Sequence, residues 1–120
     1  MTRAALSKLS LLAAVAAVTA LGEIAELWLN NTPAGNHWLD VKLVGKKSNR
    51  DGIGAVVRIG KQYNPMTSAF GYASSSHGPV HFGLGKSSVP PEVEVRWPSG
   101  KVQIVRPKFI DQVLTVVEPD

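Results

Sequence analysis

The feature that most constrains the fold is the alternation of apolar and polar side chains after residue 36. In the segment 38–44, Leu39, Val41 and Leu43 occupy every second position, with polar residues between them. Successive side chains of a strand point to opposite faces, so this spacing predicts a strand with one buried face. No helical period of useful length follows residue 30. The sequence therefore predicts an all-β domain.

Turn-forming residues divide the rest of the domain into short strands. Pro98-Ser99-Gly100 is the clearest turn, because Pro suits the second turn position and Gly accepts positive φ. Pro65 lacks an amide donor, which places its strand at a sheet edge or bulge. Apolar residues on both faces of the last strand predict a central position for it. The strands expected at 38–44, 55–59, 62–69, 80–84, 92–97, 102–105 and 112–117 predict a small antiparallel β-sandwich or barrel of about seven short strands.

The first twenty residues have the pattern of a secretory signal peptide. Arg3 and Lys8 precede an apolar stretch, 9–21, which ends in small residues. We expect cleavage after Ala20, because Val18-Thr19-Ala20 offers the small side chains that a signal peptidase requires before its cut. The stretch is also shorter than the roughly twenty apolar residues of a membrane span. An uncleaved apolar N-terminal helix is the alternative, since Ala and Leu are strong helix formers. The expected location is secreted or periplasmic, with membrane attachment only if the segment is uncleaved.

The residues between this segment and the domain fall into two parts. Residues 22–29 are apolar and acidic, and predict either a strand left from something upstream or a continuation of the helix. Residues 30–36 are turn formers and predict a linker. The expected organisation is a signal peptide or helix at 1–20, a linker or repeat remnant at 21–35, and a β domain at 36–118.

Charge and cysteine content exclude some classes of function. Thirteen Lys and Arg stand against nine Asp and Glu, which gives a net charge of +4, and there is no cysteine. The cations are spread out and do not alternate with aromatic residues, so no nucleic-acid partner is expected. Without cysteine the domain has no disulfide and no thiolate metal site.

The local motifs predict little chemistry. Asn49 and Asp51 offer oxygens to a cation, which makes them weak calcium-ligand candidates, but an EF-hand needs more acids and a distal Glu. A tight loop is the favoured interpretation, so no cofactor is expected, with calcium as the alternative. The spacing of His37, His77 and His81 matches no compact metal motif.

Neither pattern that resembles a catalytic group is complete. The serines at 74–76 precede His77, but a catalytic serine also needs an orienting acid and an oxyanion site. Glu92 and Glu94 alternate on one strand, and Arg96 continues the same face, which predicts a charge-mixed surface. We therefore expect no catalytic residues and no enzyme activity.

The three tryptophans have different expected roles. Trp97, at the end of a strand, is expected to anchor the core. Trp38 alternates with the apolar face of its strand, so it is expected to cap the domain edge or to contact a preceding module. Trp28 lies in the apolar segment before the linker. Trp28 and Trp38 are the predicted interaction residues.

Several short motifs occur together in one order and with approximately conserved spacing across residues 36–118. These motifs are NHWL at 36–39, KLVG at 42–45, SNRDGIGA at 48–55, GY at 71–72, HFGLG at 81–85, VRWPSG at 95–100 and DQVL at 111–114. With these motifs the chain resembles the ASPIC/UnbV family, which includes cartilage acidic protein and UnbV proteins.

The resemblance implies a role for the domain through the repeats that precede it in other family members. In that family the domain follows FG-GAP/VCBS-type repeats, which form a β-propeller with calcium-binding loops in exported proteins. No catalytic residue is carried over. The repeats are missing here, and residues 27–31 look like the tail of the last one. The chain is therefore expected to be either a stand-alone remnant or a truncated gene product. The implied function is a non-catalytic exported binding module with a protein or propeller partner; the alternatives are an accessory component of a biosynthetic enzyme system and a small calcium-binding protein.

Overall fold

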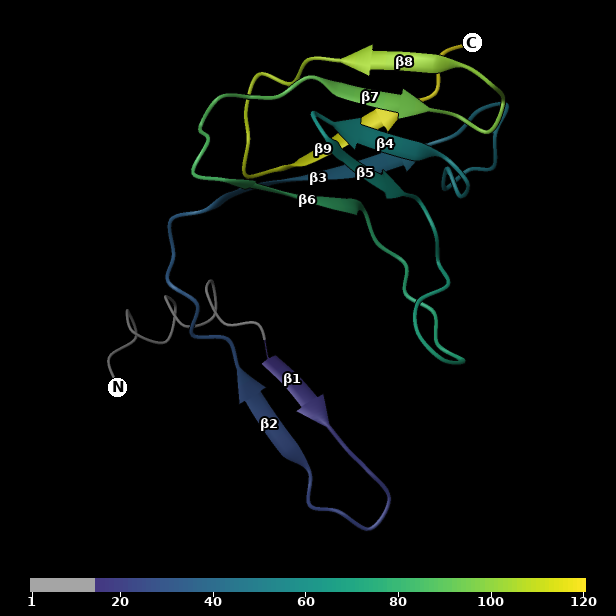
Figure 1. Cartoon of the computed structure of the whole chain (residues 1–120). Coiled ribbons are helices and arrows are strands. Elements are labelled where there is room, and N and C mark those ends of the chain that lie inside the picture. Colours follow the sequence, from purple (N-terminus) through teal and green to yellow (C-terminus); the bar gives the residue numbers. More distant parts are fainter. Residues whose placement is uncertain (1–14) are drawn as a thin grey trace. The chain divides into compact units, whose positions relative to one another are not determined.

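The computed structural model describes residues 15–120, which divide after Gly35 into two compact units (Figure 1). In the first unit, β1 (Val15–Val18) and β2 (Glu26–Leu29) form an antiparallel hairpin. The second unit, Asn36–Asp120, contains β3 (His37–Val44), β4 (Val56–Ile59), β5 (Gln62–Pro65), β6 (Val80–Gly85), β7 (Val93–Arg96), β8 (Val102–Val105) and β9 (Val113–Val117).

The seven strands of the second unit form two sheets, with the orders β6-β3-β9 and β5-β4-β7-β8. The prediction of an all-β domain is confirmed, and every pair in the four-stranded sheet is antiparallel. The expectation of a wholly antiparallel fold was wrong, because β9 runs parallel to β3. The chain leaves β8 in one sheet and enters β9 in the other, so β9 does not return as a hairpin partner.

The position of β9 also differs from the prediction. β3 is the central strand of its sheet and β9 is an edge strand. Val116 is buried, whereas Val113 and Val117 on the other face are 50% and 45% exposed. Apolar residues on both faces therefore did not mean that both faces are covered. β5 ends at Pro65, earlier than expected, and its position at a sheet edge confirms the prediction from this proline.

The expected N-terminal helix is not found in the described residues. Most of it, residues 1–14, lies outside them. Val15–Val18 is a strand that pairs with β2, so the segment 22–29 is not a helical continuation. The β-branched valines at both ends of β1 suit a strand better than a helix. In residues 15–120 no helix has the length and apolar character needed to span a membrane.

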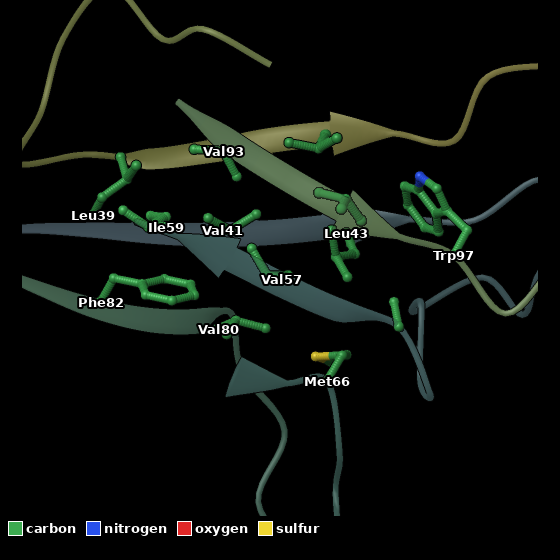
Figure 2. Packing of buried hydrophobic residues seen from close by; sticks show 13 residues of the cluster. Leu39, Val41, Leu43, Val57, Ile59, Met66, Val80, Phe82, Val93 and Trp97 are labelled. Carbon is green, nitrogen blue, oxygen red and sulfur yellow. The ribbon is translucent and has the colours of Figure 1, made fainter. Parts of the chain in front are cut away.

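Alternate residues of the two sheets meet in one apolar core (Figure 2). Leu39, Val41 and Phe82 come from the three-stranded sheet and are fully buried, as are Val57 and Val93 from the four-stranded sheet. Each such side chain stabilises the fold by about 1.5–3 kcal/mol relative to exposure. The cluster also contains Leu43, Ala55, Ile59, Met66, Val80, Val95, Val116 and Trp97, which is 3% exposed and confirms its predicted role as a core anchor.

Side-chain amides connect the two sheets along both open sides. On one side, Gln62 Nε2 donates to the Gly83 carbonyl oxygen at 3.0 Å and Asn64 Nδ2 donates to the His81 carbonyl oxygen at 2.9 Å. On the other side, Gln103 Nε2 donates to the Val117 carbonyl oxygen at 3.2 Å. These bonds replace a backbone ladder between the sheets, so the domain is a sandwich and not a closed barrel.

We expect Gln103→Leu to lower the free energy of unfolding by about 1–2 kcal/mol. Gln103 Oε1 accepts the hydrogen of Trp97 Nε1 at 2.9 Å, and a leucine would leave this buried indole donor unpaired. The matched control is Gln62→Leu, which removes the exposed amide bond on the other side and should cost about half as much. Urea unfolding followed by tryptophan fluorescence measures both variants. Equal losses would show that the Trp97 contact adds nothing.

The strand directions place the connections at two ends of the sandwich. The last residues of β3, β5, β7 and β9 lie at one end. We call this the loop end; it carries the connections 45–55, 66–79 and 97–101 and residues 118–120. The opposite end carries the start of β3 and the connection 106–112. The candidate sites lie at or between these ends.

Candidate functional site

A cluster of aromatic and charged side chains lies on the outer face of the three-stranded sheet. Trp38 and Asp40 point away from the core, because Leu39 between them is fully buried. The register of β3 with β6 sets Asp40 opposite His81, and the His81 ring stacks on Trp38 with 6.3 Å between centroids. We name this cluster the Trp38 surface; it consists of His37, Trp38, Asp40, His81 and Asp111.

Two histidine–aspartate pairs hold the Trp38 surface. His81 Nδ1 lies 2.6 Å from Asp40 Oδ1, and His37 Nδ1 lies 2.7 Å from Asp111 Oδ2. Asp111 also fixes the backbone of Trp38, because its Oδ1 accepts from the Trp38 amide at 3.1 Å and its own amide donates to the Trp38 carbonyl at 2.8 Å. The hydrogen bond from His37 holds the pKa of the Asp111 carboxyl below its usual value. The position of Trp38 is thus set by contacts from two distant segments.

The Trp38 surface offers stacking and hydrogen bonding but no enclosed pocket. Its side chains are partly open to solvent: 66% exposed for His81, 42% for Asp111 and 21% for Asp40. Each imidazole has its Nδ1 on a carboxylate and presents Nε2 as its second hydrogen-bonding atom. A tryptophan with polar neighbours on a sheet face is typical of protein interaction surfaces.

The sequence identified Trp38 but not the residues around it. Its outward direction follows from strand alternation. His81 and Asp111 lie 41 and 74 residues from their partners, so no local spacing links them. Only the pairing of β3 with β6 and with β9 brings these segments together.

The structure places Asn49 and Asp51 in one tight loop. Asn49 Nδ2 donates to the Ile53 carbonyl at 2.7 Å, and its Oδ1 accepts from the Ile53 amide at 2.8 Å. Asp51 Oδ1 accepts from Arg50 Nε at 3.3 Å. Within the described range, no group of three or more His, Cys, Asp or Glu converges to hold a metal. The geometry therefore fits the tight-loop interpretation.

Glu92 and Glu94 lie in a network of opposite charges. Arg96 Nε donates to Glu94 at 2.8 Å, and the Arg106 guanidinium lies 2.8 Å from Glu92. The hydrogen bond from Arg96 lowers the pKa of Glu94. This direction is opposite to the raised pKa of a general acid. The prediction of a charge-mixed surface is confirmed.

Trp28, the other predicted interaction residue, lies in β2 and is 62% exposed. Its Nε1 donates to Glu26 Oε2 at 3.0 Å. Leu27 and Leu29 beside it are 68% and 61% exposed, so both faces of the hairpin carry open apolar side chains. A two-stranded hairpin of this kind is marginally stable in water by itself.

One important group was missed by the sequence. Glu118 is the only buried charged residue in the part of the chain that the structure describes. Its Oε2 accepts from the amides of Lys46 and Ser48 at 2.7 and 2.8 Å. Its Oε1 accepts from the hydroxyls of Ser48 and Ser99 at 2.9 and 2.6 Å. We call these four residues the Glu118 clasp; it joins the end of β9 to two connections at the loop end.

The environment of Glu118 keeps it ionised. Burial alone raises its pKa, but the hydrogen bonds from Ser99, Ser48 and Lys46 outweigh burial and lower the pKa from 4.5 to about 2. The carboxylate is thus charged at neutral pH with all four donors directed at it. In the sequence Glu118 is only the last residue of the expected domain, and its donors lie between 19 and 72 residues away.

The fold and these sites define a small two-sheet β domain with one partly exposed aromatic surface and one buried carboxylate clasp. The family model described as ASPIC and UnbV matches residues 45–120. The chain therefore belongs to the ASPIC and UnbV family, which confirms the resemblance drawn from its motifs. Searches of curated proteins and of solved structures gave no match.

Proposed function

We propose that this chain is an exported, non-catalytic interaction module that binds a β-rich protein through the Trp38 surface. The observation that carries the proposal is the fixed, outward position of Trp38. Asp111 holds the tryptophan backbone through two hydrogen bonds, and His81 stacks on its ring. Such preorganisation lowers the entropy that binding would otherwise cost.

The exposed apolar strand β2 supports a β-rich partner. Leu27, Trp28 and Leu29 lie open on β2, and β2 pairs only with β1 among the strands that the structure describes. Cleavage after Ala20 removes β1, so a partner strand can take its place beside β2 through backbone hydrogen bonds and cover the apolar side chains. The family resemblance implies an FG-GAP/VCBS propeller as this partner. The signal-like start of the chain supports export.

We expect Trp38→Ala to weaken binding to a separately produced FG-GAP/VCBS propeller from the same genome by about tenfold or more, because a central tryptophan contributes strongly to an interface. Surface plasmon resonance with the immobilised propeller measures the affinity. The matched control is Tyr63→Ala, which removes a 55% exposed aromatic residue from the other sheet and should change affinity by less than about twofold. Failure of the unaltered chain to bind, or equal affinity of the Trp38→Ala variant, would contradict the proposal.

A further inference from the structure

We propose that a pocket at the loop end binds a small, uncharged and largely apolar molecule. The pocket has a volume of about 370 Å³ and lies where β5 ends and β6 begins. The pocket and the Trp38 surface are different sites, because His81 is the only residue that belongs to both. The lining residues are Asn64, Pro65, Met66, Thr67, Phe70, Ser76, Gly78, Pro79, Val80 and His81.

The lack of Asp, Glu, Lys and Arg in the lining of the pocket determines the class of ligand. The stretch from Gln62 to Gly85 contains no Asp, Glu, Lys or Arg, although these residues make up 18% of the chain. Every lining residue comes from this stretch. His81, the one titratable residue of the lining, already has its Nδ1 on the Asp40 carboxylate. A charged ligand would therefore lose water here without gaining a free opposite charge, which is unfavourable. An uncharged ligand avoids this cost.

The floor of the pocket is apolar and rigid. Met66 and Val80 are 5% and 6% exposed and belong to the core, and Figure 2 shows both at one margin of the cluster. The Met66 backbone is fixed, since its amide donates to the Ala55 carbonyl at 2.8 Å and its carbonyl accepts from the Gly54 amide at 2.9 Å. A polarisable thioether on a fixed backbone is well suited to contact an aromatic or aliphatic ligand.

A few polar groups accompany the apolar lining. Asn64 Nδ2 donates to the His81 carbonyl oxygen at 2.9 Å, so the Oδ1 of Asn64 is the atom that can accept a hydrogen bond from a ligand. Ser76 also lines the pocket, and its hydroxyl can donate or accept a hydrogen bond. Mostly apolar walls with a small number of polar groups are the usual composition of small-molecule sites. The ligand is thus expected to carry one hydrogen-bond donor on an apolar body.

The loop above the pocket positions two aromatic residues differently. The Ser76 amide donates to the Ser68 carbonyl at 2.9 Å, which folds residues 68–76 back on themselves. Phe70 lines the pocket and is 53% exposed. Tyr72, at the tip, is 100% exposed and is not among the lining residues. Phe70 and Tyr72 therefore form a matched pair for a test.

The test is a fluorescence titration of the full chain with N-phenylnaphthylamine, an uncharged apolar probe. We expect saturable binding to one site, about fivefold weaker binding by Phe70→Ala because part of an apolar wall is lost, and unchanged binding by Tyr72→Ala. Binding that does not saturate, or an equal loss in both variants, would overturn the proposal. Tighter binding of the anionic anilinonaphthalene sulfonate would also overturn it, because the ligand class would then be wrong.

A second measurement locates the probe without any substitution. The chain has two methionines, so isotope-labelled methyl groups give at most two signals in an NMR spectrum. We expect the Met66 signal to shift on titration and the Met1 signal to stay in place. A Met66 signal that does not move when the probe is saturating would place the probe elsewhere and reject the pocket.

Discussion

Replacing Glu118 by Ala is expected to lower the melting temperature of the domain by at least about 10 °C. Two amides and two hydroxyls now donate to this carboxylate, and alanine would leave all four donors facing a buried space. Unsatisfied buried donors are costly because they have already lost their water. Thermal unfolding at neutral pH, followed by circular dichroism, measures the change.

The same carboxylate should make the domain sensitive to acid. Its pKa is about 2 in the folded chain and 4.5 as its ordinary value, so the folded state favours the ionised form. The stabilisation is fully present above about pH 5 and is lost as the pH falls from 4.5 toward 2. Glu118→Gln keeps the shape of the side chain without its charge, and should remove this part of the pH dependence.

Glu92→Gln is the matched control for both measurements. Glu92 pairs with Arg106 on the surface and is 48% exposed, so its loss should shift the melting temperature by less than about 2 °C. Similar melting temperatures for Glu118→Ala and Glu92→Gln, or an unchanged acid profile in Glu118→Gln, would contradict a structural role for the Glu118 clasp.

Gly52→Ala is expected to lower the free energy of unfolding by about 3 kcal/mol. This value adds the cost of a left-handed backbone conformation at a residue with a Cβ to the cost of overpacking the core. Gly52 has a φ of +66°, and a Cβ at this position would lie 2.6 Å from the Cβ of Leu43. Leu43 is 4% exposed and belongs to the core, so it has little room to move. Urea unfolding at neutral pH measures the loss.

Gly60 provides the matched control for Gly52. Its φ of +59° is nearly the same, but no atom lies within 4 Å of the added Cβ. Gly60→Ala should therefore cost only the backbone part, about 1 kcal/mol. Equal losses at the two glycines would show that the contact with Leu43 is relieved by a small shift. At Gly54, in the same loop as Gly52, the nearest atom to an added Cβ is 3.5 Å away, so the packing there is looser than at Gly52.

The local features of the fold could be predicted because they depend on near neighbours in the chain. The alternation of Leu39, Val41 and Leu43 defined a strand and its buried face. Pro65 placed β5 at a sheet edge, because its missing donor is a property of the residue itself. Trp38 was expected to point away from the core for the same reason of alternation.

The features that could not be predicted depend on which strands become neighbours. The parallel pairing of β9 with β3 is one of them, because strand alternation is the same in parallel and antiparallel sheets. The apolar residues of β9 suggested a covered strand, but Val113 and Val117 lie on an open face. The apolar start of the chain suggested a helix, yet Val15–Val18 pairs as a strand.

By itself the sequence determined an all-β domain of short strands, the buried face of most of them, and membership of the ASPIC and UnbV family. Tertiary structure alone decided the order of the strands, the partners of Trp38 and the four donors around Glu118. The physical reason is distance along the chain: side-chain alternation acts between adjacent residues, whereas Lys46 and Glu118 meet across 72 positions when β9 pairs with β3. Ser99 follows a strand of the other sheet, so it reaches Glu118 only when the two sheets pack. The burial of the Glu118 carboxylate is therefore a consequence of tertiary packing, and no local sequence pattern predicts it.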